Sequence, residues 1–235
     1  MKLYKIYSRA IGLLFALSLL CVGCENEDIL DINDLEISPS NPESVVIVEP
    51  DDGITSVNAL TKAINENGDA TYILRRDGVY YMEGKNVFKH NVVIKAENGS
   101  GKMPIIQPIC DAQGALNADM IRLEGSATFE NIYIIGKDAA TGNLMQRLFR
   151  IDESNVRLKF DNCFIDHCRN FCIRTDNVNN KIYLNNSTIR NLALTSDPAN
   201  GRLIDSRGNE QDSIVINNCY ANSLYLIISI KHKNS

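Results

Sequence analysis

The chain has 235 residues and a net charge of −5, from 24 Lys and Arg against 29 Asp and Glu. An acidic balance without a basic cluster gives no electrostatic basis for nucleic-acid binding and argues against that class of partner. The sequence has no Trp, so Tyr and Phe would have to supply any aromatic surface on which sugars stack. Without its export and linker segments, the chain is long enough for one folded domain.

Residues 1–23 have the pattern of an export signal. Lys2, Lys5 and Arg9 precede an uncharged run over 10–22, which is short for a transmembrane span. The sequence 21–24, Cys-Val-Gly-Cys, resembles a bacterial lipobox and predicts cleavage before Cys24 and acylation of Cys24. We therefore expect a lipid-anchored protein of the outer membrane, exposed on the cell surface; plain secretion is the alternative.

Residues 24–52 are rich in acidic residues and contain three prolines. Such a segment cannot bury enough apolar surface to fold, so we interpret it as a tether. Acidic residues directly after a lipid-bearing Cys also resemble the surface-export signals of some Gram-negative lipoproteins. The run 45–48, Val-Val-Ile-Val, is a candidate strand at the entry to the folded domain, which we expect over 53–235.

The stretch 55–64 predicts a solitary amphipathic helix. Thr55 is a candidate N-cap, positions 57, 60 and 64 are apolar on one helical face, and Asn67-Gly68 is a stop signal. Short apolar runs over 91–96 and 104–107 then predict early strands. A helix placed before a run of strands would cover the open first coil of a β-solenoid.

Four alternating runs, each with a central Asn, follow over 129–134, 160–165, 184–189 and 216–221. The Asn-to-Asn spacings of 31, 24 and 32 residues are typical of a solenoid whose strands are joined by loops of variable length. Asn suits a sharp bend, and stacked coils would place the amides about 4.8 Å apart. The sequence predicts a buried ladder of asparagines at Asn131, Asn162, Asn186 and Asn218.

A strand upstream of each Asn run predicts a second column, with alternate side chains facing solvent. The outward residues are Arg122, Glu124, Arg150, Asp152, Arg174, Asp176, Asp205 and Arg207. One interpretation is diagonal pairing of Arg with acid along the sheet. The other is a glycan-binding strip, in which Arg makes forked contacts with sugar hydroxyls and carboxylates and the acids could hold Ca²⁺.

Cys163, His167, Cys168 and Cys172 lie close enough in sequence to raise the question of a metal site. In the repeat register, however, Cys163 and Cys219 directly follow the Asn and point into the core. We therefore expect buried structural cysteines and no metal; a Cys168–Cys172 disulfide and a metal site are the alternatives. No Ser/His/Asp order, phosphate-binding loop or paired metal-carboxylate motif is present.

The apolar stretch 224–230 predicts a last strand, and no capping helix follows it in the sequence. An uncovered last coil would expose strand edges. This pattern favours either a chain shortened relative to its relatives or a partner that covers the C-terminal coil.

The segments 57–64, 68–74 and 77–80 resemble the entry cap of pectin lyase-like right-handed parallel β-helices. The likeness is strongest to the chondroitinase B-like branch and to uncharacterised surface lipoproteins of polysaccharide-degrading bacteria, and it covers about residues 55–228. It implies an all-β fold: a right-handed parallel β-helix with an N-terminal capping helix.

The resemblance also implies a polysaccharide partner. Chondroitinase B-like enzymes cleave uronic-acid polysaccharides by β-elimination, which needs a cation to neutralise the uronate and a base to take a proton. No Lys, Arg and acid set of this sequence matches the family's catalytic set, so the catalytic residues are unassigned. The prediction is a cell-surface lipoprotein that binds polysaccharide without efficient catalysis. The alternatives are a polysaccharide lyase and a truncated, non-functional product.

Overall fold

The computed structural model describes residues 44–53, 55–193, 200–224 and 226–229. The predicted signal peptide, Cys24 and most of the tether lie outside these ranges. Residue 230, the last of the predicted final strand, and residues 231–235 lie outside them too. No helix of the described residues is long and apolar enough to span a bilayer.

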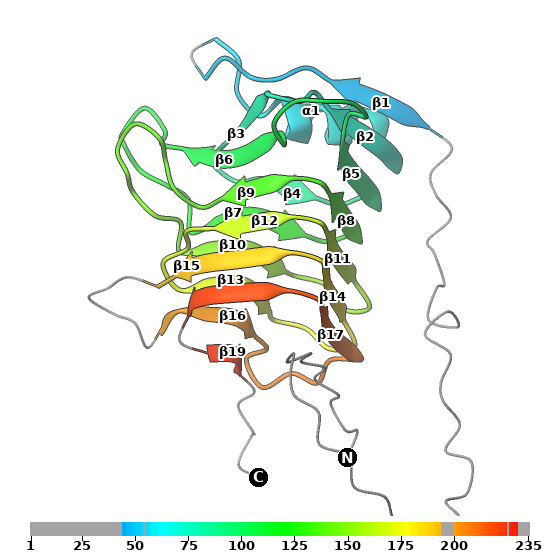
Figure 1. The fold of residues 1–235 in the computed structure, drawn as a ribbon, viewed down its shortest axis with the longest axis vertical. Coiled ribbons are helices and arrows are strands. Elements are labelled where there is room, and N and C mark those ends of the chain that lie inside the picture. The colour runs from blue at the N-terminus through cyan, green and yellow to red at the C-terminus, as the bar shows by residue number, and fades with distance from the viewer. Residues whose placement is uncertain (1–43, 54, 194–199, 225, 230–235) are drawn as a thin grey trace, which may run out of the picture.

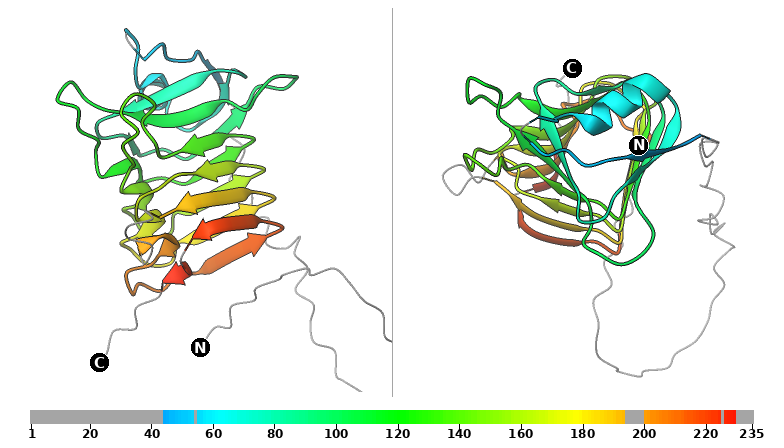
Figure 2. Two further views of the ribbon diagram at one scale, coloured as in Figure 1. Left: turned by 60° about the vertical axis from the view of Figure 1, so that its left-hand side comes forward. Right: turned by 90° about the horizontal axis from the view of Figure 1, so that it is seen from above.

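The strands form three parallel sheets that wind around one interior (Figures 1 and 2). Sheet A has seven described strands, and sheets B and C have six each. Successive strands along the chain belong to different sheets, and each pairs in parallel with the strand one coil away. The predicted right-handed parallel β-helix is therefore confirmed.

The bounds of the strands follow sheet by sheet. Sheet A consists of β1 (Val45–Val48), β2 (Ala70–Leu74), β5 (Val92–Ala96), β8 (Ala127–Glu130), β11 (Arg157–Asp161), β14 (Lys181–Asn185) and β17 (Ser213–Asn217). Sheet B consists of β3 (Val79–Glu83), β6 (Ile105–Ile109), β9 (Tyr133–Ile135), β12 (Phe164–Asp166), β15 (Thr188–Leu192) and β18 (Tyr220–Leu224). Sheet C consists of β4 (Val87–Phe88), β7 (Asp119–Leu123), β10 (Arg147–Ile151), β13 (Phe171–Thr175), β16 (Arg202–Asp205) and β19 (Leu226–Ser229).

The expected entry strand at 45–48 is present as β1, which pairs with β2 from Val45↔Thr71 to Val48↔Leu74. The sheet therefore begins inside the segment that the sequence assigns to the tether. The reason is that four consecutive β-branched residues favour an extended conformation and gain a full ladder of hydrogen bonds from β2.

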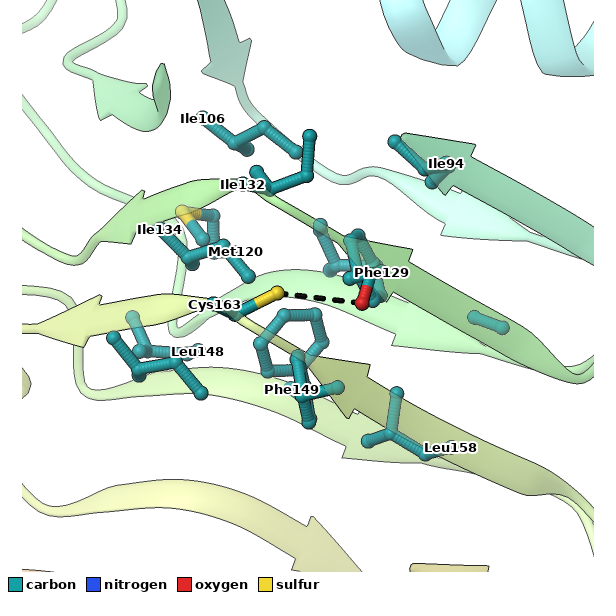
Figure 3. Packing of buried hydrophobic residues seen from close by; sticks show 14 of the residues in the cluster. Ile94, Ile106, Met120, Phe129, Ile132, Ile134, Leu148, Phe149, Leu158 and Cys163 are labelled. Carbon is teal, nitrogen blue, oxygen red and sulfur yellow. Dashed lines mark hydrogen bonds between the residues drawn. The ribbon is translucent and has the colours of Figure 1, made fainter. Parts of the chain in front are cut away.

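The interior is filled by the apolar residues of the alternating runs (Figure 3). Phe129 and Phe160 occupy equivalent positions in neighbouring coils, and their rings stack with centroids 5.4 Å apart. Phe149 meets both rings edge-on from sheet C, at 5.3 and 5.1 Å. Because in-register strands place like side chains above one another, the core is a continuous column along the solenoid axis.

The helix α1 (Ala59–Asn67) covers the first coil (Figures 1 and 2). Leu60 and Ile64 are fully buried, which confirms the predicted cap. Gly68, with φ 71°, donates its N–H to the Ile64 carbonyl at 2.9 Å and ends the helix as expected.

The start of the helix differs from the expected residue 55. The side chain of Asp52 accepts hydrogen bonds from the backbone N–H groups of Thr55 and Ser56, at 2.7 and 2.8 Å, and so holds them in a turn. Asn58, with φ 63°, precedes the first helical residue. Asp51 receives the N–H of Ala59 and thereby takes the capping role that the sequence suggested for Thr55.

The four predicted ladder asparagines stack in register, but on the outside of the solenoid. Their φ angles are 58° at Asn131 and 50° at Asn162, Asn186 and Asn218, and the last three side chains are exposed. Strict alternation would turn the Asn inward. The left-handed residue breaks that alternation, so that the Asn faces solvent and the next residue, such as Cys163, faces the core. The expectation that the ladder is buried is therefore wrong.

The exposed ladder is also interrupted. Asn162 donates to Asn131 at 2.6 Å and Asn218 donates to Asn186 at 2.9 Å. Asn186, however, donates to the carboxylate of Asp161 at 3.1 Å and not to Asn162. A carboxylate is a stronger acceptor than an amide oxygen, which favours this exchange of partner.

A buried Asn does occur at another corner, between sheets C and A. Asn180 is fully buried, and its Oδ1 accepts the N–H of Val156 at 2.9 Å while its Nδ2 donates to the Asn177 carbonyl at 3.2 Å. The amide thus satisfies backbone groups that the corner leaves unpaired.

The cysteines of the described chain are free thiols. Cys163, Cys168 and Cys172 are buried, as predicted for structural cysteines, whereas Cys219 in the last described coil is partly exposed. Burial raises the pKa of Cys163 and of Cys168 to about 12. They are therefore protonated, apolar members of the core at neutral pH.

Candidate functional site

The predicted arginine column exists on the outer surface of sheet C. Arg122, Arg150 and Arg174 are in register on β7, β10 and β13, and their side chains are 25, 26 and 19% exposed. The inward positions between them are buried, as the alternation predicts.

The acids of this column pair with its arginines both within a coil and from one coil to the next. Arg122 donates to Asp152 at 3.3 Å. The Nε of Arg150 lies 2.7 Å from carboxylate oxygens of both Asp152 and Asp176. Arg174 donates to Asp176 at 2.9 Å. The diagonal pairing that the sequence offered as one interpretation is therefore present.

Asp119, at the start of β7, is a central residue of this region that the sequence pattern missed. Its side chain is fully buried. Its Oδ2 accepts from Arg122 Nε at 3.0 Å, its Oδ1 is in close contact with Arg147 Nε, and Arg150 Nη1 lies 3.7 Å from Oδ2. The sequence spacing of Asp119 and Arg147 does not predict that they meet. Their contact follows from the register of β7 and β10, which pairs Asp119 with Arg147.

We call the arginines and aspartates on and directly after the strands of sheet C the arginine–aspartate face. It comprises Asp119, Arg122, Arg147, Arg150, Asp152, Arg174, Asp176, Arg202 and Asp205. Five arginines against four aspartates leave one net positive charge. Burial alone would lower the pKa of Arg150, but the charges of Asp152, Asp176 and Asp119 outweigh it and raise that pKa.

Three predicted members of the strip lie differently from the arginines. Asp205 is in register with Arg174 but is 1% exposed; neither of its carboxylate oxygens has a hydrogen bond, and Arg202 Nη1 is 4.0 Å away. Its predicted solvent exposure is wrong, because alternation along a strand predicts the face of the sheet but not how far neighbouring groups cover that face. Glu124 and Arg207 are exposed beyond the ends of β7 and β16.

A second polar cluster lies on sheet B, around the side chain of Asp166, which is 1% exposed. Its Oδ2 accepts from Tyr133 Oη at 2.9 Å and from Arg190 Nε at 2.9 Å, and its Oδ1 accepts from Asn191 Nδ2 at 2.8 Å. The buried Nδ1 of His167 lies 2.7 Å from Oδ1, out of line for a hydrogen bond. These five residues, from three successive coils, are the Asp166 cluster.

The pKa directions within the Asp166 cluster follow from its contacts. Burial alone would raise the pKa of Asp166, but the hydrogen bonds from Arg190, Asn191 and Tyr133 and the nearby His167 lower it overall. Burial raises the pKa of Tyr133, and its bond to Asp166 raises it further. At neutral pH the cluster therefore holds an ionised carboxylate and a neutral phenol.

Aromatic rings border the Asp166 cluster. Tyr133 and Phe164 are in register, with ring centroids 5.2 Å apart in an edge-to-face arrangement. The guanidinium of Arg190 lies 4.6 Å from the centre of the Phe164 ring. Stacking on Phe164 and pairing with Asp166 together fix Arg190, whose side chain remains 45% exposed.

The sequence pattern missed this cluster because its members come from three coils and His167 is isolated in sequence. The Asp166 cluster would be predicted from the register of β9, β12 and β15. This register places Ile135, Asp166 and Arg190 side by side. His167 and Asn191 then fall at the same corner, and both have φ 56°.

No group of three or more His, Cys, Asp and Glu side chains in the described part of the chain is arranged to hold a metal ion. Asp119, Asp152 and Asp176 of the arginine–aspartate face contact guanidinium groups instead. Their oxygens are thus already engaged by cations of the protein itself.

The sequence matches no protein-family model and no curated protein. Among solved structures, the chain is similar to the PL6 family alginate lyase AlyGC, with a TM-score of 0.45 and 16% identity. The aligned region covers 82% of this chain and 30% of that one, so the chain spans less than a third of the length of that lyase. The likeness concerns the course of the backbone and assigns no role to any residue.

Proposed function

We propose that this chain is a cell-surface lipoprotein that binds polysaccharide along the flank of its β-helix. The observation that carries the proposal is the in-register column Arg122, Arg150 and Arg174 on the arginine–aspartate face. Neighbouring strands lie about 4.8 Å apart, so the column presents guanidinium groups at a regular spacing along the solenoid axis. A polymer that lies along this axis meets the same side chain in each coil.

The pairing with aspartates suits such a surface. Each guanidinium has five N–H donors, and the contacts with Asp152 and Asp176 fix its direction while part of the side chain stays exposed. Donors that are held in place before binding lose less conformational entropy when a sugar hydroxyl or carboxylate arrives. The net positive charge of the face favours an acidic glycan over a neutral one.

The arginine–aspartate face is built for binding and not for proton transfer. An elimination requires a group that accepts a proton, and guanidinium groups stay charged in proteins. Asp152 and Asp176 are engaged with those guanidinium groups. A lyase activity, the alternative function, would thus need a base elsewhere on the solenoid. Calcium is not part of the proposal, because the carboxylates already contact arginines.

The proposal also includes the location of the protein. We propose that an acylated Cys24 attaches the chain to the membrane and that the folded domain is exposed at the outer surface. Support comes from the export signal, the lipobox-like sequence at 21–24 and the acidic segment that follows it. One acyl chain gives only marginal membrane binding, whereas two or more give stable anchoring.

The double substitution Arg150→Ala with Arg174→Ala tests the binding face. We expect affinity for a bound acidic polysaccharide, measured by affinity electrophoresis and by calorimetry on the full-length chain in detergent, to fall at least about tenfold, since charge-assisted hydrogen bonds contribute about 1.5–3 kcal/mol each. Arg150→Lys with Arg174→Lys keeps the charge but removes the forked geometry; we expect it to give an intermediate loss.

The matched control is Arg75→Ala with Arg76→Ala, two arginines just after β2 on another surface. It should leave the affinity unchanged. Unchanged binding in the Arg150 and Arg174 variants, with folding intact by circular dichroism, would show that the polymer does not lie on this face. A failure to bind alginate, pectin, chondroitin sulfate and a wider glycan array would exclude the proposed function itself.

A further inference from the structure

We propose that the free edge of β1 binds the same edge of a second copy of this chain, so that sheet A continues from one protomer into the other. β1 is the first strand of sheet A, and β2 is its only partner among the described strands. The two copies of β1 run antiparallel about a twofold axis, as a contact between identical surfaces requires. This surface is separate from the arginine–aspartate face and does not depend on polysaccharide binding.

The backbone of β1 leaves two residues without hydrogen-bond partners. Thr71 of β2 donates its N–H to the carbonyl of Ser44 at 2.9 Å, and in a parallel ladder alternate residues face the neighbouring strand. The N–H and C=O groups of Val45 and Ile47 therefore point away from β2. No hydrogen bond from the described part of the chain reaches these groups, so they are available to a further strand.

The first edge of sheet B, at the same end of the solenoid, is closed by the chain itself. Asp51 donates its N–H to the Val79 carbonyl at 2.9 Å and accepts the N–H of Tyr81 on Oδ2, also at 2.9 Å. Asn58 donates its N–H to the Tyr81 carbonyl at 2.9 Å and accepts the N–H of Glu83 on Oδ1 at 2.8 Å. The fold thus covers β3 with specific contacts and leaves β1 open beside it.

The side chains of β1 are apolar on both faces of the strand. Val45 and Ile47 are 63 and 55% exposed on the outer face, whereas Val46 packs against the core and Val48 is buried. β1 contains no charged residue and no proline, which are among the features that keep an edge strand from pairing. A partner must therefore supply unpaired backbone groups and apolar side chains without a counter-charge. A second copy of β1 supplies both.

A twofold axis at Val46 gives the pairing a specific register. Val45 of one protomer then lies opposite the partner's Ile47, and the two residues exchange both of their backbone hydrogen bonds. Their exposed side chains meet on the outer face, because opposite residues of antiparallel strands share a face of the sheet. The unpaired backbone groups and the exposed side chains of β1 are thus satisfied by one contact.

The contact is small, because each protomer contributes one short strand. It buries less than the roughly 1,200 Å² at which stable complexes begin, so the pairing is weak in dilute solution. Segment 24–43 ends directly before Ser44, and the proposed anchor at Cys24 therefore keeps β1 within about 70 Å of the membrane. Two anchored copies share this layer, which raises their effective concentration and favours the pairing.

Disulfide cross-linking tests the register. The full-length chain in detergent carries Val45→Cys in one preparation and Ile47→Cys in another, with tags of different size. The register places these two positions opposite each other, with Cα atoms about 5.5 Å apart and within reach of a disulfide. Identical positions lie about 8 Å apart. We expect the mixture to form a mixed dimer under mild oxidation, and each variant alone to form no more than the unmodified chain, whose own thiols give the background.

Amide hydrogen exchange at single-residue resolution tests what covers the edge. The Val46 amide should be protected at every protein concentration, because it is bonded to β2, whereas the amides of Val45 and Ile47 should become protected as the concentration rises. Ile47→Lys should reduce the protection at Val45 at least about tenfold, since a charge on an edge strand opposes pairing. The matched control is Val178→Lys, at another exposed valine, and it should leave the protection unchanged.

Three results would overturn the proposal. A mixture that cross-links no better than the single variants would exclude this register and with it the contact. Protection of Val45 and Ile47 at every concentration would show that a segment of the same chain covers the edge, and rapid exchange at every concentration would show that the edge stays solvated. Neither measurement involves a polysaccharide, so a failure of the proposed function leaves this inference standing.

Discussion

Two buried carboxylates, Asp119 and Asp166, organise the charged surfaces of this protein at the scale of single residues. Their side chains are 0 and 1% exposed, and each is surrounded by groups from neighbouring coils. A buried charge is tolerated only when opposite charges and hydrogen bonds replace the lost water. Each aspartate therefore fixes the side chains around it, and through them the geometry of the outer surface.

Asp119→Asn should destabilise the protein by about 3 kcal/mol, because it leaves Arg147, which is 8% exposed, without its carboxylate partner and leaves Arg122 with Asp152 alone. The measurement is the free energy of unfolding from urea denaturation. Glu124→Gln, an exposed acid just beyond the same strand, is the control and should change stability by less than about 0.5 kcal/mol. A loss for Asp119→Asn as small as that of the control would mean that the arginines are solvated in the native state.

At the scale of the structural element, the corners between consecutive strands decide which face of a sheet a side chain occupies. The left-handed asparagines end the strands of sheet A, and each shifts the alternation by one residue. The next strand then begins with its apolar residues on the correct side. The asparagines are thus required for their backbone conformation, and the exposed amide contacts between them add little.

A pair of substitutions at Asn162 separates these two roles. Asn162→Ala should cost about 1–2 kcal/mol, because alanine is strained at φ 50°. Asn162→Gly should cost less, although it removes the same bond to Asn131, because glycine adopts this conformation without strain. Thermal and urea unfolding of both variants provide the comparison. An equal loss for both would assign the stability to the amide ladder instead.

At the scale of the whole molecule, the stacked coils form a one-dimensional array. Each described coil contacts mainly the coil above and the coil below, as the sheet orders show, so a solenoid depends on what covers its ends. At the first coil, α1 provides that cover through Leu60 and Ile64. The helix therefore stabilises the array as well as its own segment.

Ile64→Ala should lower the free energy of unfolding by about 2–5 kcal/mol, because it opens a cavity where the helix meets the core. Glu66→Ala, at an exposed position of the same helix, is the matched control and should have an effect below about 0.5 kcal/mol. Urea denaturation gives both values. An effect of Ile64→Ala below about 1 kcal/mol would show that the helix contributes little to covering the first coil.

The repeated runs of alternating residues determined the fold by themselves. The central Asn at 131, 162, 186 and 218 marks the register of the coils, and the arginine column at 122, 150 and 174 follows from that register. Both predictions concern local periodicity, which depends only on the two-residue repeat of a strand. The predicted burial of the amides is wrong because alternation does not continue through a left-handed residue.

The tertiary structure alone decided which charges are buried and which side chains meet. Asp119 and Arg147 are 28 residues apart, and Tyr133, Asp166 and Arg190 come from three coils. Their contacts depend on loops whose length the periodicity does not fix. The sequence thus determines a parallel solenoid with an outward row of arginines, whereas the packing of one coil on the next determines where a carboxylate is buried and which histidine lies against it.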